Sequence, residues 1–280
     1  ILRLIKLIYK LGIFINLMNS PLFDVVEMTP IQPIGKTILQ AFTGSGLVAS
    51  LVANHVIDCL GLIEKGYISS SLIPSVGIVR DGIIQRPIRI YESDKYILVL
   101  SEVAIIEENL VEFIDYLFDW YSKIDPSSLI IIGALPTGRP NDATDLRYNI
   151  VASDDVTREF LSEKGIWTLP QGAIYGSVAL SLMESKRSGI ACFSILSHCI
   201  ATIPDYLAAK KVSELLNIVL DENMDLSKLN TNALELKDHL INRSKQSKDD
   251  LEYNDYNQYD SYEYDESIDD DEDDDLSAFI

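Results

Sequence analysis

The sequence predicts an α/β protein whose central sheet is largely parallel and covered by helices on both faces. Segments typical of strands alternate along the chain with segments typical of helices, which is the order that parallel strands with crossover helices require. Several strand segments are continuously apolar, as expected when both faces of a sheet are buried. The chain has 280 residues, 47% of them hydrophobic, which is enough for a full core. No linker divides this body, and we therefore predict one folded domain.

The predicted strands are short apolar runs bounded by glycine, proline or polar residues. They cover residues 36–42, 77–81, 88–91, 96–101, 128–134 and 189–196. The run SLIIIGA at 128–134 has no polar alternation and predicts a strand in the interior of the sheet. Asp81-Gly82 is a turn signal that follows the second of these strands.

The predicted helices cover residues 47–60, 107–123, 154–164, 172–186, 203–220 and 225–240. The segment at 107–123 shows the helical period most clearly, since its apolar residues recur every three or four positions. These apolar residues are Leu110, Phe113, Ile114, Leu117 and Phe118. Gly165 is a typical stop for the helix at 154–164.

The formal charge of −20 is concentrated near the C-terminal end. Residues 249–280 hold 15 acidic residues and no Lys or Arg, so the other 248 residues carry only −5. An excess of acids argues against a nucleic-acid partner, because phosphate backbones would be repelled. The segment from 245 to 275 has almost no aliphatic residues and can bury too little surface to fold. We therefore predict a disordered acidic tail over residues 245–280 that acts as a solvated spacer.

The acidic tail ends in apolar residues that are out of character with it. The last three residues are Ala278, Phe279 and Ile280. Such an ending predicts a short docking motif, in which side chains enter a pocket and the terminal carboxylate is captured by a cation or by backbone amides.

We predict that the folded domain covers residues 29–244. Residues 1–28 are predicted to form an extension outside it. Basic residues interrupt the apolar opening, which is too short to span a bilayer. An ordinary strand–helix pattern begins only near Lys36, so Met18 or Met28 is the expected start. The alternative is an interfacial basic helix at the very beginning that tethers the protein to a membrane surface. The main prediction has no membrane partner.

One motif is similar to a known ligand-binding loop. The segment GSGLVA, which begins with Gly44, Ser45 and Gly46, lies between a predicted strand and helix and fits the G-x-G-x-x-A fingerprint of dinucleotide-binding folds. The carboxylate that such a site needs after the next strand is missing, because serines occupy that position. We interpret the glycines as a tight strand-to-helix turn. No metal-ligand spacing and no Walker motif occurs, so we predict no metal, no cofactor and no catalytic residue.

Several segments are together similar, in order and spacing, to the archaeal branch of the proteasome assembly chaperone family. They are QAFTGSGLVA at 40–49, LIPSVG at 72–77, VRDG at 79–82, PIRIY at 87–91, SEVAI at 101–105, GALPTGR at 133–139 and IPDYLAA at 203–209. The residues at the centre of the family-like loops are Gly44, Ser45, Gly46, Ser101 and Glu102.

The resemblance implies a three-layer α/β/α sandwich of phosphorylase/hydrolase-like architecture without enzymatic activity. It also implies a cytoplasmic homo-oligomer, or a complex with a hetero-partner of the same family, that binds the α subunits of the proteasome 20S core. Some members end in a hydrophobic–tyrosine–any tripeptide that inserts between neighbouring α subunits. Ala278-Phe279-Ile280 is similar to that tripeptide, with Phe in place of Tyr. The implied function is assembly of the α ring or ATP-independent activation of the finished core.

The alternative function is that of a hydrolase- or phosphorylase-like enzyme. In this hypothesis the Gly44–Gly46 loop holds a phosphate at the N-terminus of a helix. It predicts a pocket lined by Gly46, Ser101, Glu102 and Arg139. It leaves the C-terminal tripeptide without a purpose, and a filled, apolar loop region would count against it.

Overall fold

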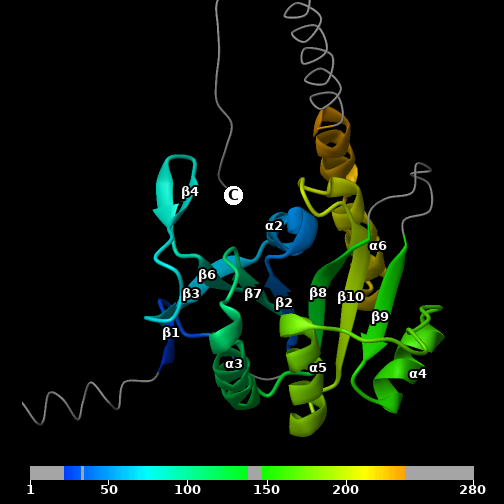
Figure 1. Ribbon diagram of the computed structural model, residues 1–280, viewed down its shortest axis with the longest axis horizontal. Helices are drawn as coiled ribbons and strands as arrows, with labels where there is room; N and C mark the ends of the chain where they lie inside the picture. The colour runs from blue at the N-terminus through cyan, green and yellow to red at the C-terminus, as the bar shows by residue number, and fades with distance from the viewer. Residues whose placement is uncertain (1–21, 33–34, 138–146, 237–280) are drawn as a thin grey trace, which may run out of the picture. The chain divides into compact units, whose positions relative to one another are not determined.

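The computed structural model describes residues 22–32, 35–137 and 147–236 (Figure 1). By its internal contacts the chain divides after residue 233, and the account below concerns the first unit. The expectations for the first 17 residues and for the acidic tail at 245–280 lie outside the described residues. No helix in the described ranges is long and apolar enough to cross a membrane.

The core of the fold is an eight-stranded mixed sheet with the order β1-β3-β6-β7-β2-β8-β10-β9. Its strands are β1 (Phe23–Glu27), β2 (Thr37–Phe42), β3 (Ile63–Ser70), β6 (Ile88–Glu92), β7 (Tyr96–Ser101), β8 (Ser128–Pro136), β9 (Tyr148–Ala152) and β10 (Cys192–Cys199). The four central strands β7, β2, β8 and β10 are parallel, and the flanking strands pair antiparallel. The short strands β4 (Ile78–Arg80) and β5 (Ile83–Gln85) form a separate hairpin.

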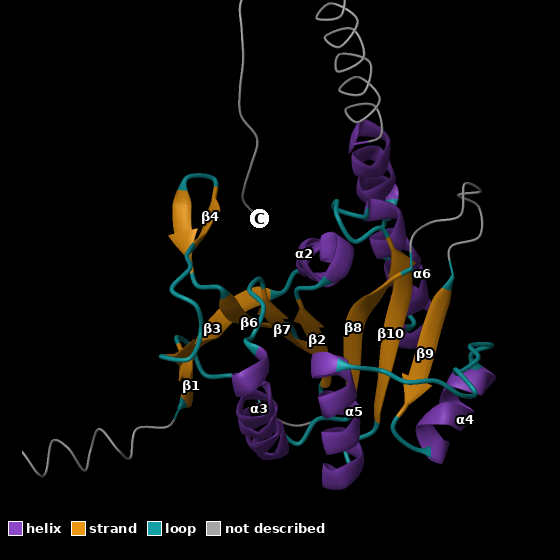
Figure 2. Ribbon diagram, viewed as in Figure 1, coloured by secondary structure: helices purple, strands orange, loops and turns teal. Residues whose placement is uncertain are grey.

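Helices cover both faces of the sheet, as the sequence predicts. They are α2 (Val48–Leu60), α3 (Leu110–Ile124), α4 (Asp155–Glu163), α5 (Gly176–Ser188) and α6 (Tyr206–Leu220), with short 3-10 turns η1 (Ser45–Leu47) and η2 (Glu107–Asn109). Figure 2 shows α3 and α5 in front of the sheet, while α2 and α6 pack together on the other face. The predicted three-layer α/β/α sandwich is therefore confirmed.

The strands divide their side chains between two apolar layers because successive residues point to opposite faces. In β2, Leu39 and Ala41 are buried with α2 and α6. Ile38 is buried on the other face among residues of α3. Such alternating burial on both faces explains why the central strands are apolar throughout.

The sequence reasoning did not list β3 or β5 among its strands, and it did not predict the two edge strands, β1 and β9. β1 lies within the stretch assigned to an extension, yet Phe23 is only 1% exposed and β1 pairs with β3 along its whole length. β9 pairs antiparallel with β10. Both segments are five residues long and carry polar residues, so their pattern alone does not distinguish them from loops.

A small polar cluster lies between the sheet and the α3–α5 layer. The Gln40 side chain is 1% exposed, donates from Nε2 to Ser181 Oγ (2.8 Å) and accepts from Tyr121 Oη (3.1 Å). Buried polar groups of this kind are tolerated only when they are paired. Burial also raises the pKa of Tyr121, so its phenol remains a donor. The cluster therefore fixes α3 and α5 to β2 at one position.

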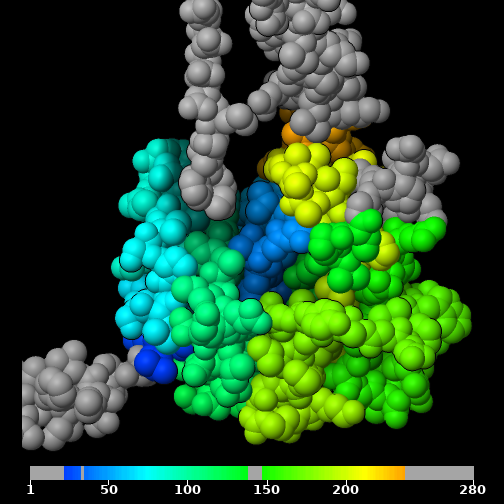
Figure 3. Space-filling model, in the orientation of Figure 1, coloured from blue at the N-terminus to red at the C-terminus, as the bar shows by residue number. Residues whose placement is uncertain are grey.

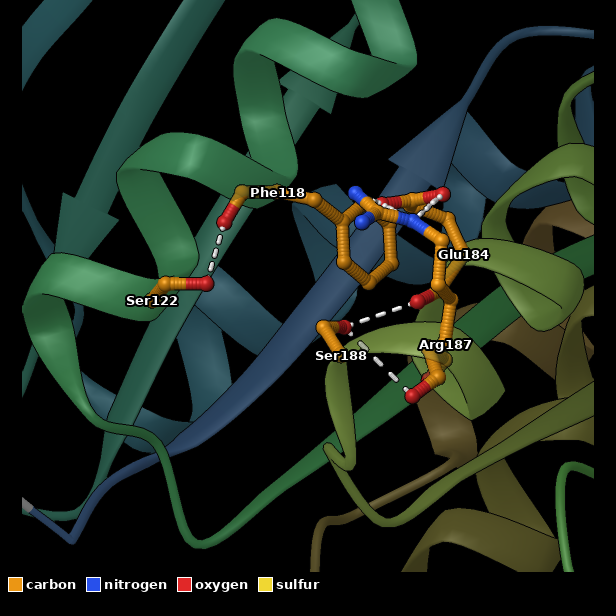
Figure 4. Close-up of polar contacts among 6 residues, drawn as sticks. Phe118, Ser122, Glu184, Arg187 and Ser188 are labelled. Atoms are coloured by element: carbon orange, nitrogen blue, oxygen red, sulfur yellow. Dashed lines mark hydrogen bonds and ion pairs between the residues drawn. The ribbon is translucent and has the colours of Figure 1, made fainter.

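The neighbouring helices α3 and α5 are held mainly by apolar packing at the rest of this face. Figure 4 shows the ring of Phe118 directed from α3 toward α5, where Arg187 Nε donates to Glu184 Oε1 (2.8 Å). Arg187 is exposed, so this ion pair adds little to stability.

Removing the Tyr121 hydroxyl should destabilise the fold. In Tyr121→Phe the buried Gln40 Oε1 loses its donor, and we expect the free energy of unfolding to fall by about 1–2 kcal/mol. The matched control is Tyr175→Phe, because Tyr175 is 83% exposed and should change stability by less than about 0.5 kcal/mol. Urea unfolding followed by circular dichroism measures both, and equal stability of the two variants would contradict the role of the cluster.

Candidate functional site

The loop at Gly44–Gly46 connects β2 to α2 at the carboxyl end of the parallel strands. The Thr43 amide donates to Ser101 O (2.8 Å), which ties the start of the loop to β7. Gly46 has a φ of +63° and Leu47 a φ of +51°, so the chain turns through two left-handed residues before α2 begins. The glycine at position 46 is required by this conformation. The interpretation of the motif as a tight strand-to-helix turn is thus confirmed.

The same loop is in close contact with the connection between β10 and α6. A Cβ atom on Gly46 would lie 2.8 Å from Ile200 O and 3.2 Å from Cys199 Sγ. The Gly46 amide donates to Ala201 O (3.3 Å), and its carbonyl accepts from the Asp205 amide (2.8 Å). The Gly46 amide, which an anion-binding loop would offer to a ligand, is here hydrogen-bonded to the protein itself.

Asp205 is the acidic residue that holds this contact in place. It is 3% exposed and caps α6, since its carboxylate accepts from the amides of Ala208 (3.0 Å) and Ile200 (2.9 Å). Its Cβ would lie 3.2 Å from a Cβ on Gly46. Two of the family-like segments, at 40–49 and 203–209, therefore meet at Gly46 and Asp205. A buried carboxylate next to the loop also opposes binding of a phosphate.

Ser101 and Glu102 are bound by groups of the protein itself. The Ser101 hydroxyl is fully buried and donates to Val103 O (2.7 Å). The Glu102 carboxylate accepts from both Arg80 and Arg89. Arg139, the fourth residue of the predicted enzyme pocket, lies outside the described residues.

The pairing of Glu102 with two arginines joins three strands. Arg80 lies on β4, Arg89 on β6, and Glu102 follows β7 directly. Arg89 is 2% exposed, donates also to Gln85, and its guanidinium lies 5.5 Å from the centre of the Tyr91 ring. Burial raises the pKa of Tyr91 to about 12, so the ring stays neutral beside this cation. Loss of Glu102 would leave a buried positive charge unpaired, which is costly. We therefore assign Glu102 a structural role.

A cavity of about 570 Å³ lies at the opposite edge of the sheet, at the amino ends of the parallel strands. Its polar side carries Thr37 and Ser128, whose hydroxyls are 3.1 Å apart, and its apolar side includes residues of α4 and α6. Near it Glu222 accepts from Lys95 (2.9 Å) and Tyr96 Oη (2.8 Å), and these bonds lower the pKa of Glu222. The cavity contains none of the predicted site residues.

The predicted docking residues Ala278, Phe279 and Ile280 lie outside the described residues. In the part of the chain that is described, no group of histidine, cysteine and acidic side chains is arranged to hold a metal ion. Sequence reasoning found the glycine turn and the start of α6, but it missed that Gly46 and Asp205 touch and that Glu102 binds two arginines. The sequence did carry a signal for the contact of Glu102. Arg89 lies within the apolar run PIRIY at 87–91, and a buried cation needs a partner.

These observations define a three-layer α/β protein in which the loop residues Gly46, Glu102 and Asp205 hold its own segments together. The family model of the PAC2 family matches residues 38–242, and the chain belongs to this family. The resemblance to proteasome assembly chaperones is thereby confirmed.

Three proteins are similar to this chain in sequence or in fold. The uncharacterized protein MJ0106 of Methanocaldococcus jannaschii is 21% identical over 79% of this chain and 90% of its own. The crystal structure of Pyrococcus furiosus PbaA, described as an archaeal homolog of proteasome-assembly chaperone, matches 87% of this chain and all of that chain with a TM-score of 0.77 and 21% identity. P. furiosus PbaB, described as an archaeal proteasome activator, matches 80% of this chain and all of that chain with a TM-score of 0.70 and 18% identity.

Alanine at Gly46 should lower the free energy of unfolding much more than alanine at Gly44. Gly46→Ala forces a side chain into a left-handed conformation against Ile200 O, and we expect a loss of about 2–3 kcal/mol in the free energy of unfolding. Gly44→Ala is the matched control, because Gly44 is extended and no atom lies within 4 Å of its added Cβ. Its cost should stay below about 1 kcal/mol. Chemical denaturation compares the two, and a larger loss at position 44 would contradict the described loop.

Proposed function

We propose that this chain is a non-catalytic proteasome assembly chaperone or ATP-independent proteasome activator. Membership of the PAC2 family carries the proposal. The fold it shares with a protein described as a homolog of proteasome-assembly chaperone and with one described as a proteasome activator supports it. In this proposal the partners are the α subunits of the 20S core, and the protein acts in the cytoplasm.

The geometry of the loop supports a binding protein over the enzyme alternative. The Gly46 backbone is bound to the β10–α6 connection, and Asp205 places a buried carboxylate beside it. Ser101 and Glu102 are committed to structural contacts. An enzyme that uses this loop for phosphate would have to break those contacts before each turnover.

The docking element of the proposal is the C-terminal tripeptide Ala278-Phe279-Ile280. Phe279 would fill an apolar pocket between neighbouring α subunits, and the terminal carboxylate of Ile280 would pair with a cation there. The acidic segment before it would act as a solvated spacer that repels itself and extends. A homo-oligomer, or a complex with another member of the family, would present several tails to a symmetric ring and gain avidity.

Deleting the tripeptide should weaken binding to the α ring strongly. We expect the full chain to bind a purified cognate α ring in surface plasmon resonance, and a chain ending at Ser277 to show at least a tenfold weaker interaction. The matched control ends at Ile280 but carries Ser277→Ala, which leaves the docking residues intact. Equal binding by full-length and truncated chains would move the interface to the α/β body.

The aromatic residue of the motif offers a graded test. Phe279→Tyr restores a hydroxyl that can form one more hydrogen bond, worth about 1 kcal/mol, so we expect roughly fivefold tighter binding. Phe279→Ala removes the ring and should weaken binding more than tenfold. The same surface plasmon resonance assay ranks the variants, and the order Ala tighter than Phe would contradict an aromatic pocket.

A further inference from the structure

The cavity at the amino ends of the parallel strands has the size and lining of a small-molecule site. Its volume of about 570 Å³ lies within the range of about 300–1,000 Å³ that is usual for such sites. The most buried apolar residues of its lining are Ile130 on β8 and Phe193 on β10, which are 2% and 3% exposed. Val156 and Phe160 on α4 and Val219 on α6 complete the apolar side. The proposed function makes no use of this cavity.

Polar bonds tie the elements around the cavity to one another. Lys164 follows α4 directly, and its Nζ lies 2.5 Å from Asp221 Oδ1 at the end of α6. On the other side Glu222 accepts from Lys95 Nζ (2.9 Å) and from Tyr96 Oη (2.8 Å), which joins the start of β7 to the end of α6. The walls of the cavity are therefore preformed, as in most small-molecule sites.

The cavity is accessible from solvent on the side of α4. Figure 1 shows α4 beside β9 at the edge of the sheet, and Figure 3 shows it at the surface of the body. Val156 and Phe160, which line the cavity from α4, are 77% and 40% exposed. Ser127 and Ala191, which precede β8 and β10, are exposed too. A small molecule can therefore enter without the unfolding of a helix or strand.

Three hydroxyl groups form the polar side of the cavity. Thr37 Oγ1 lies 3.1 Å from Ser128 Oγ and 3.3 Å from Ser127 Oγ. Each hydroxyl has one donor and two acceptor sites, so these two bonds leave acceptor capacity on all three oxygens. This group can therefore accept a hydrogen bond from an amine, amide or hydroxyl of a ligand.

The charged residues of the lining favour an uncharged ligand. Its lysines are each bonded to a carboxylate, Lys36 to Glu92 (2.6 Å) and Lys95 to Glu222 (2.9 Å). An anion would have to displace one of these carboxylates before it could pair with a lysine. Asp94 is exposed, and an ion pair between an exposed carboxylate and a cationic ligand is worth little.

We propose that this cavity binds an uncharged, mainly apolar small molecule that carries one hydrogen-bonding group. The apolar part packs on Ile130, Phe193 and Phe160, and its burial provides most of the binding free energy. The hydrogen-bonding group lies against the hydroxyls of Thr37 and Ser128. This site goes beyond the proposed function and does not depend on it.

The first experiment compares two fluorescent probes that share one skeleton. N-phenyl-1-naphthylamine is uncharged, consists of two aromatic groups joined by one N–H, and becomes more fluorescent in apolar surroundings. 8-Anilino-1-naphthalenesulfonate adds an anionic sulfonate to the same skeleton. We expect the full-length chain to bind the amine saturably, and the sulfonate about tenfold more weakly. Absence of saturable binding of the amine, or equal binding of both probes, would overturn the proposal.

The second experiment fills the cavity. Ala191 lines it and lies two positions before Phe193, so both side chains point to the same face. Ala191→Phe should weaken binding of the amine about tenfold or more. The matched control is Ala104→Phe, because Ala104 is also exposed but follows the carboxyl end of β7. Circular dichroism melting verifies that both fold, and equal binding by the two variants would place the probe elsewhere and overturn the proposal.

A milder variant tests the polar side without filling the cavity. Thr37→Val keeps the branched shape of the side chain on β2 and removes its hydroxyl. We expect binding of the amine to weaken about fivefold, which corresponds to one hydrogen bond. Unchanged binding would overturn the role of the hydroxyl group.

The preference for an uncharged ligand has its own test. Glu222→Gln removes the charge that pairs with Lys95 but keeps an acceptor for Tyr96 Oη. The sulfonate should bind this variant about tenfold more tightly than the wild type, while binding of the amine stays the same. Unchanged binding of the sulfonate would overturn the assigned preference.

Two further measurements separate this site from the proposed function. The chain ending at Ser277 should bind the amine like the full chain, and Ala191→Phe should bind the α ring like the wild type. Loss of the amine from the truncated chain would assign the probe to the chain end and overturn the proposal.

Discussion

The structure depends on the close approach of Gly46 to the connection between β10 and α6. At this point the loop that leaves the central strand β2 touches the loop that leaves β10, with β8 between the two strands. The Gly46–Asp205 backbone bond and the carboxylate cap of α6 fix both connections at once. Helices α2 and α6, which these loops begin, can then pack together over one face of the sheet. The edge at which many α/β proteins bind ligands is thereby filled by the protein itself.

Much of the centre of this fold could be predicted from the sequence, because its strands are buried on both faces and its helices have clear apolar periods. β8 and α3 are examples, since each carries a continuous or periodic apolar pattern. β1 and β9 could not be predicted, because edge strands are short and partly polar. The roles of Glu102 and Asp205 could not be predicted either, since both depend on partners far away in the sequence or on another loop. The docking tripeptide was found by its contrast with the acidic residues before it, and its role stays a prediction.

The described body and the acidic segment have different physical tasks in this account. The body uses its chemically suggestive residues for internal contacts: a glycine turn, a helix cap and two arginines, one of them buried, on one carboxylate. Its exposed surface includes the apolar side chains of the β4–β5 hairpin. In the proposed function, binding to the α ring falls to the chain end, where a few apolar residues would enter a pocket and several copies would add avidity.

The central claim is that the chain engages the proteasome core through its C-terminal end and not through a catalytic site. Electron cryo-microscopy of the full-length chain bound to the cognate 20S core tests this most directly. The account predicts density for Phe279 and Ile280 between neighbouring α subunits, with the Gly44–Gly46 loop still closed against the β10–α6 connection. Density that places the α/β body on the ring while the pockets between α subunits are empty would contradict it.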